Sequence, residues 1–130
     1  MTTVMVFEAH PAVRAGIVRR LESEERITVL AAHSEPFAFA VDIARFNPDI
    51  AVVGTFGSDG IMAARAAATS ATATKVVVLD SGLWTDGLRD LPAGVTVVAD
   101  GPRGDALAAV VRNRAGAESE VAQMSNRFSA

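Results

Sequence analysis

Short runs of β-branched and other apolar residues recur along this chain, and segments with helical spacing separate them. The runs span residues 4–7, 27–32, 50–53, 76–79 and 95–98. They largely lack an alternating polar face, which is typical of strands covered on both faces, as in a parallel sheet. This recurrence constrains the fold most, because parallel strands need long crossover connections between them.

Helical patterns fill the segments between the runs. Behind Pro11, which suits a first helical turn, one apolar stripe consists of Val13, Ile17 and Leu21. For the second helix we expect Ser34 as N-cap and an end at residues 47–48, with an apolar stripe of Phe37, Ala40, Val41 and Ala44. Further helices are expected over residues 60–71, within 83–91 and over 102–114.

The order of elements is therefore βαβαβαβαβα, which predicts an α/β fold. We expect a doubly wound, five-stranded parallel sheet with right-handed crossovers and helices on both faces. For five such strands, the flavodoxin-like order 2-1-3-4-5 is favoured.

Length and composition narrow the class of protein. The 130 residues suffice for one domain, which we assign to 1–114, while 115–130 shift in composition and are expected to be a C-terminal tail or the start of a linker. A net charge of −3 argues against direct nucleic-acid binding, and the lack of cysteine excludes a thiol nucleophile. Without a signal peptide or an apolar run of ~18 residues, we expect a cytoplasmic protein with no membrane contact.

The carboxyl ends of the strands are where such a sheet binds ligands. Three carboxylates follow predicted strands there, those of Glu8, Asp80 and Asp100, and residues 54–60 form a glycine-rich loop. The only lysine, Lys75, lies at the opposite end of its strand. Oxygen ligands of this kind suit Mg²⁺, but loop and capping roles explain them as well. We predict no bound metal and no cofactor.

Two stretches resemble a known family. Residues 8–17 read EAHPAVRAGI and are similar to the DDHPxVRxGL opening of bacterial response-regulator receiver domains, most closely those with a LuxR-type helix-turn-helix output. Residues 47–55, NPDIAVVGT, resemble the segment that carries the family's phosphorylation site. The similarity covers about residues 3–114. It implies a CheY-like fold and a role in two-component signal transduction.

The same resemblance implies that the phosphorylation site is degenerate. The family's two metal-binding acids correspond to Glu8 and Ala9, and its phosphoacceptor aspartate corresponds to Gly54. Its conserved threonine or serine corresponds to Asp80, and its lysine to Ala99. An acyl phosphate needs a carboxylate nucleophile, which glycine lacks.

We therefore expect an atypical receiver that is not an enzyme and that signals or regulates transcription without phosphorylation. It would act by dimerisation or by contact with another protein, and we expect a homodimer. No helix-turn-helix segment follows residue 114, so any DNA-binding output domain is expected outside this chain. The alternative is a ligand- or metal-gated switch at the acidic rim of Glu8, Asp80 and Asp100. A cofactor carrier on the same fold is a third reading, which fold alone does not exclude.

Overall fold

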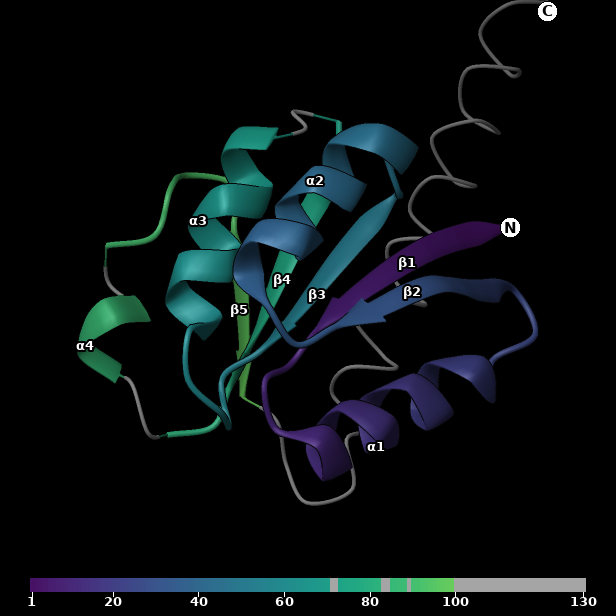
Figure 1. Ribbon diagram of the computed structural model, residues 1–130, viewed down its shortest axis with the longest axis horizontal. Helices are drawn as coiled ribbons and strands as arrows, with labels where there is room; N and C mark the ends of the chain where they lie inside the picture. The colour runs from purple at the N-terminus through teal and green to yellow at the C-terminus, as the bar shows by residue number, and fades with distance from the viewer. Residues whose placement is uncertain (71–72, 83–84, 89, 100–130) are drawn as a thin grey trace, which may run out of the picture.

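Five parallel strands form the centre of the molecule in the computed structural model, which describes residues 1–70, 73–82, 85–88 and 90–99 (Figure 1). The strand order is β2-β1-β3-β4-β5, as the sequence predicts. The strands are β1 (Thr2–Phe7), β2 (Ile27–His33), β3 (Ile50–Gly54), β4 (Lys75–Asp80) and β5 (Thr96–Ala99).

Helices cover both faces of this sheet. In Figure 1, α2 (Pro36–Phe46) and α3 (Gly60–Ser70) lie side by side on one face, and α1 (Pro11–Glu22) lies on the other. A short helix, α4 (Thr85–Leu88), precedes β5. The helix expected over 102–114, the tail at 115–130 and Asp100 lie outside the described residues.

The core consists of two apolar layers, one on each side of the sheet. On the α2–α3 side, the rings of Phe7 and Phe39 lie 5.6 Å apart, and the small side chains of α3 allow close packing. On the α1 side, Ile17 and Leu21 pack on β1 and β3. Burial of each large apolar side chain stabilises the fold by roughly 1.5–3 kcal/mol.

The first helix confirms its predicted stripe. Ile17 and Leu21 are buried, and Pro11 occupies the first turn. The N-cap residue is His10, whose Nδ1 accepts a hydrogen bond from the Val13 N–H at 3.3 Å. This cap fixes where the chain turns after β1, and so places the residues that follow that strand.

The second helix corrects two predictions. Its N-cap is Glu35, because Pro36 starts the helix, so Ser34 lies outside it. Its buried side also differs from the predicted stripe, since Phe39 and Ile43 face the core while Phe37 is 75% exposed. The helix is apolar on both sides, so periodicity alone could not select the buried one.

The edge strand β2 departs from the expectation of burial on both faces. It pairs only with β1 in the described sheet, and its residues alternate between buried or half-buried and exposed positions. The register shifts between Val4 and Met5, whose partners are Val29 and Ala31. Leu30, which the shift skips, is 42% exposed.

Candidate functional site

The carboxyl ends of the central strands meet at one edge of the sheet, as predicted. Glu8 follows β1, Gly54 ends β3, Asp80 ends β4 and Ala99 ends β5. The strand register pairs Gly54 with Leu79, and Asp80 with Ala99. The described positions that correspond, by the sequence resemblance, to a receiver's phosphorylation site therefore lie at one edge of the sheet.

The side chain of Glu8 is completely buried, and main-chain donors surround its carboxylate. The Phe56 N–H donates to Oε1 at 2.9 Å. The N–H groups of Gly57 and His10 donate to Oε2 at 3.0 and 2.8 Å. Hydrogen bonds to a charged acceptor are among the stronger ones in proteins, so this carboxylate fixes the loop after β3 to the turn after β1.

Glycines leave the room that Glu8 fills. A Cβ atom on Gly54 would lie 2.6 Å from Glu8 Oε1 and 3.1 Å from Glu8 Cβ, and both distances are closer than van der Waals contact. A Cβ atom on Gly57 would lie 2.8 Å from the backbone nitrogen of His10 and 3.0 Å from Glu8 Oε2. The Glu8 carboxylate thus occupies the space that a side chain at position 54 would enter.

Neighbouring side chains hold the Glu8 turn in place. Arg14 Nη1 donates a hydrogen bond to the carbonyl oxygen of Glu8 at 2.9 Å. The His10 ring meets the Phe56 ring edge-on, with centroids 5.0 Å apart, and Phe56 is half exposed. The turn after β1 and the loop after β3 are therefore held together by a contact between two rings as well as by the hydrogen bonds to Glu8.

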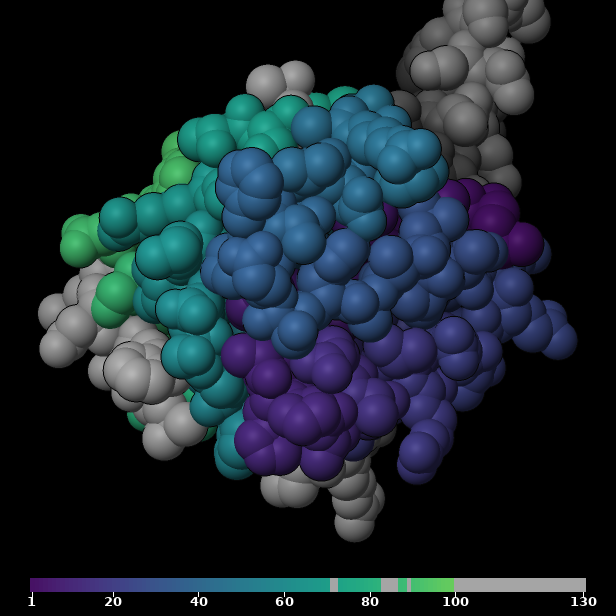
Figure 2. Space-filling view, viewed as in Figure 1, coloured from purple at the N-terminus to yellow at the C-terminus, as the bar shows by residue number. Residues whose placement is uncertain are grey.

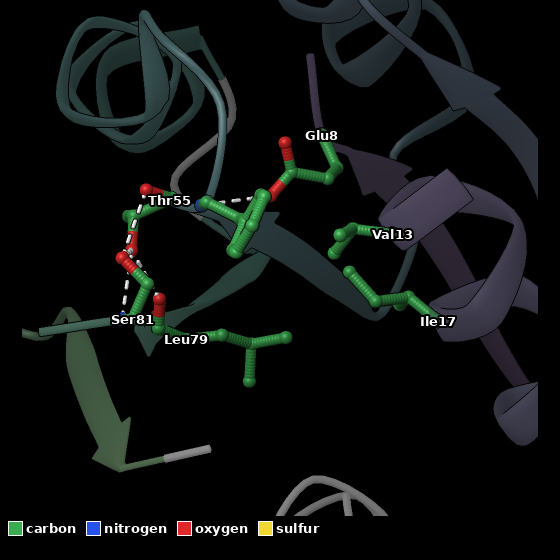
Figure 3. Close-up of a pocket in the computed structure, with 8 residues that line it drawn as sticks. Glu8, Val13, Ile17, Thr55, Leu79 and Ser81 are labelled. Carbon is green, nitrogen blue, oxygen red and sulfur yellow. Dashed lines mark hydrogen bonds between the residues drawn. The ribbon is translucent and has the colours of Figure 1, made fainter. Parts of the chain in front are cut away.

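Two hydroxyl residues, Thr55 and Ser81, join the ends of β3 and β4. The sequence analysis did not predict this link. The buried Thr55 hydroxyl donates to the carbonyl oxygen of Leu79 at 2.6 Å and accepts from the Ser81 N–H at 3.1 Å. The Ser81 hydroxyl donates to the carbonyl oxygen of Thr55 at 3.0 Å (Figure 3). The only sequence signal was a hydroxyl residue directly after each of two adjacent strands.

A cavity of about 150 Å³ opens between these groups and α1. Figure 3 shows Val13 and Ile17 on one side of it, Thr55 and Ser81 on the other, and Glu8 between them. Gly54, Phe56 and Leu79 complete the lining. The cavity has one apolar wall and one hydroxyl-bearing wall, and it has room for a few water molecules or a small ligand.

The two described carboxylates of the predicted acidic rim, those of Glu8 and Asp80, are both held by hydrogen bonds. Glu8 points inward, and Asp80 Oδ1 accepts a hydrogen bond from the Gly82 N–H at 2.7 Å. Asp100 lies outside the described residues. Within those residues, no three His, Cys, Asp or Glu side chains converge on a point where a metal ion could bind.

The chain resembles known proteins in its structure. No protein-family profile and no curated protein sequence matches the chain. No helix in the described part of the chain is long and apolar enough to cross a membrane. Solved structures, in contrast, match over most of its length.

The structural matches agree with one another. The receiver domain of the putative response regulator NarL from Mycobacterium tuberculosis is 25% identical, with a TM-score of 0.65 over 88% of this chain and 97% of that one. The receiver domain of RcsB from Salmonella enterica serovar Typhimurium is 19% identical, with a TM-score of 0.66 over 89% and 90% of the two chains. A LuxR-family DNA-binding response regulator from Staphylococcus aureus is 14% identical, with a TM-score of 0.58 over 75% and 86%. The chain thus has the fold of a response-regulator receiver domain, the family that its opening motif resembles.

Proposed function

We propose that this chain is a phosphorylation-independent receiver module, which signals through protein–protein contact rather than through an acyl phosphate. The observation that carries the proposal is the pair of residues found at the ends of β1 and β3. Position 54 is a glycine, and the Glu8 carboxylate fills the space beside it. The receiver fold is that of two-component signalling proteins, so the module would keep the fold of a switch without its phosphoacceptor.

The chemistry of phosphoryl transfer supports this proposal. Transfer to an aspartate needs a carboxylate in line with the donor and positive charge to neutralise the phosphoryl oxygens. Gly54 has no nucleophile, and Ala99 is the residue that corresponds, by the resemblance, to the family's lysine. Asp80 pairs with Ala99 in the sheet. By the resemblance it takes the place of the family's threonine or serine, so it would add negative charge where a phosphoryl oxygen docks.

Glu8 is a poor replacement for the missing nucleophile. Both of its oxygens already accept hydrogen bonds from main-chain N–H groups, and its side chain has no exposed surface. A donor phosphate would have to displace those N–H groups before it could reach the carboxylate. This barrier favours a structural role for Glu8 over a role as acceptor.

The structural matches support a proposed biological role. One structural match is named as a DNA-binding response regulator of the LuxR family. We propose that this chain, too, is a cytoplasmic regulatory domain that acts as a homodimer and works with a DNA-binding output domain that is not part of it. In this role it is not an enzyme and does not contact DNA itself.

Intact-mass spectrometry tests the proposal. The protein is incubated with acetyl phosphate and Mg²⁺, alongside a receiver domain that is known to be phosphorylated. We expect the mass of this chain to stay unchanged while the control gains one phosphoryl group. A phosphoryl adduct on this chain, mapped by peptide analysis to Glu8, Asp80 or another carboxylate, would contradict the proposal.

A second candidate function is the ligand- or metal-gated switch predicted at Glu8, Asp80 and Asp100. Of these three, Glu8 lines the cavity described above, and this cavity is the observation that favours the switch, although Asp80 is not part of its lining. Titration calorimetry with Mg²⁺ and Ca²⁺, together with melting curves, discriminates the two. A ligand that binds only the native state must raise the melting temperature. Saturable heat with a raised melting temperature would support the switch, whereas their absence supports the phosphorylation-independent module.

A further inference from the structure

The outward side of α2 carries apolar side chains that nothing in the described structure covers. Phe37 is 75% exposed and Val41 is 48% exposed, and Ala38 and Ala44 beside them are exposed too. Figure 2 shows α2, in blue, open to the viewer along its length. A helix that is apolar on both sides is normally buried on both, so this outward stripe is typical of an interaction surface.

The two ends of the stripe carry opposite charges. Glu35 caps the start of α2, where its oxygens accept hydrogen bonds from the Phe37 and Ala38 N–H groups. Arg45, at the other end, is exposed and lies 5.1 Å over the Phe46 ring. Ten residues of helix separate them by about 15 Å.

Other charges near α2 are engaged or lie on its neighbour. Asp42 Oδ2 lies 2.9 Å from His33 Nε2 on β2, so this acid faces the edge strand rather than the stripe. Arg65 is exposed on α3 beside α2. The stripe therefore has an acidic start, an apolar middle and a basic end.

We infer that this stripe pairs with the same stripe of a second copy, with the two α2 helices antiparallel about a two-fold axis near Val41. The inference rests on the proposed function, for which it supplies the partner and the contact surface. A two-fold contact must be complementary to itself. Antiparallel α2 helices meet this condition, because each Glu35 then lies near the Arg45 of the other copy.

The apolar middle fits the same arrangement. Each Phe37 would pack over the Val41 and Ala44 of its partner, and the small Ala38 and Ala44 let the helices approach closely. The antiparallel arrangement also places opposite ends of the two helix dipoles together. One helix per copy buries little area, so the contact belongs to the weak, concentration-dependent class.

Sedimentation over a range of protein concentrations tests the inference. The apparent mass should rise from 13.5 kDa toward twice that value. Val41→Glu places a charge at the axis and should keep the protein monomeric. The matched control is Leu30→Glu, on the exposed part of β2, which should leave the association unchanged. A wild-type protein that stays monomeric throughout, or a Val41→Glu variant that still dimerises, would overturn the inference.

Charge exchange tests the antiparallel geometry. Glu35→Lys alone and Arg45→Glu alone should each weaken self-association, because like charges then face each other at both ends. An equimolar mixture of the two variants should form heterodimers, because every facing pair becomes opposite in sign. Native mass spectrometry reads this result directly, and a mixture that associates no better than either variant would refute the geometry.

The outcomes separate this inference from the proposed function. Circular dichroism first establishes that each variant is folded, and if Glu35→Lys does not fold, the Val41→Glu comparison decides alone. Loss of dimer in Val41→Glu together with a phosphoryl adduct in the wild type would retain the interface and refute the phosphorylation-independent role. A wild type that is monomeric and gains no phosphoryl group would refute the interface and retain the phosphorylation-independent role.

Discussion

At the scale of single residues, the site depends on a match between one large and two small side chains. Glu8 brings a buried carboxylate, and Gly54 and Gly57 leave the space and the N–H groups that it needs. Removing either the Glu8 carboxylate or the N–H groups that bind it would destabilise the fold, because a buried carboxylate or buried N–H groups without a hydrogen-bond partner cost free energy. This mutual dependence can be measured as a coupling energy.

Gly54→Ala should lower the free energy of unfolding by about 1–3 kcal/mol, because its Cβ would overlap Glu8 Oε1. Gly16→Ala is the matched control. Apart from its chain neighbours and the backbone of its own helix, no atom lies within 4 Å of a Cβ at that position in α1, so this change should raise stability by about 0.5–1 kcal/mol. Urea unfolding of both variants measures the difference, and a Gly54→Ala variant as stable as the wild type would exclude the proposed contact.

The double-mutant cycle adds Glu8→Ala. Removing the carboxylate leaves three N–H groups without their acceptor, so the single variant should be destabilised. Gly54→Ala should then cost little in the Glu8→Ala background, since the overlapping atom is gone. We expect a coupling energy of about 0.5–3 kcal/mol, and additive effects would show that the two positions are independent.

At the scale of the elements, the start of α2 depends on the ionised Glu35. Hydrogen bonds from the Phe37 N–H and then the Ala38 N–H lower the pKa of this carboxyl below its usual value of 4.5, and the nearby His33 lowers it further. A lowered pKa means that the cap stabilises the folded state above the usual pKa and is lost as the pH falls through the lowered one.

Glu35→Gln removes this dependence. The variant should melt at a lower temperature than the wild type at pH 7, because an amide is a weaker acceptor than a carboxylate for the two N–H groups. The difference between the two proteins should shrink below pH 4.5, as the wild-type carboxyl becomes protonated. Thermal melts across this range check the sign, and a difference that grows as the pH falls would contradict the assignment.

At the scale of the whole molecule, the sequence predicted the architecture because alternation is a property of long segments. Five apolar runs and the helical segments between them predict the strand order that the structure has. The buried side of α2 was predicted wrongly, because both of its sides are apolar and only the contact with the sheet selects Phe39. The bond between the Thr55 hydroxyl and Leu79 joins residues 24 apart, which no local pattern reveals.

The sequence predicted which strand ends lie together, but it did not predict how their side chains are arranged. The sequence predicts that Glu8 and Gly54 lie at the same edge of the sheet, with Glu8 as one of three carboxylates of an acidic rim. The structure instead turns Glu8 inward, onto N–H groups 48 and 49 residues away. The sequence signal for this arrangement was a change of side-chain size relative to the receiver motif that the chain resembles. Position 8 carries the longer acid, glutamate, where that motif has aspartate, and position 54 carries glycine where it has the phosphoacceptor aspartate.

The strand-end site, which the Glu8 side chain fills from within, should not react with a phosphoryl donor. Amide ¹H–¹⁵N NMR spectra with and without Mg²⁺ and acetyl phosphate test it residue by residue. We predict that the resonances of residues 8–10, 54–60 and 80–82 stay where they are. Shifts that cluster at those residues would mean that the site binds or reacts, and they would contradict the account.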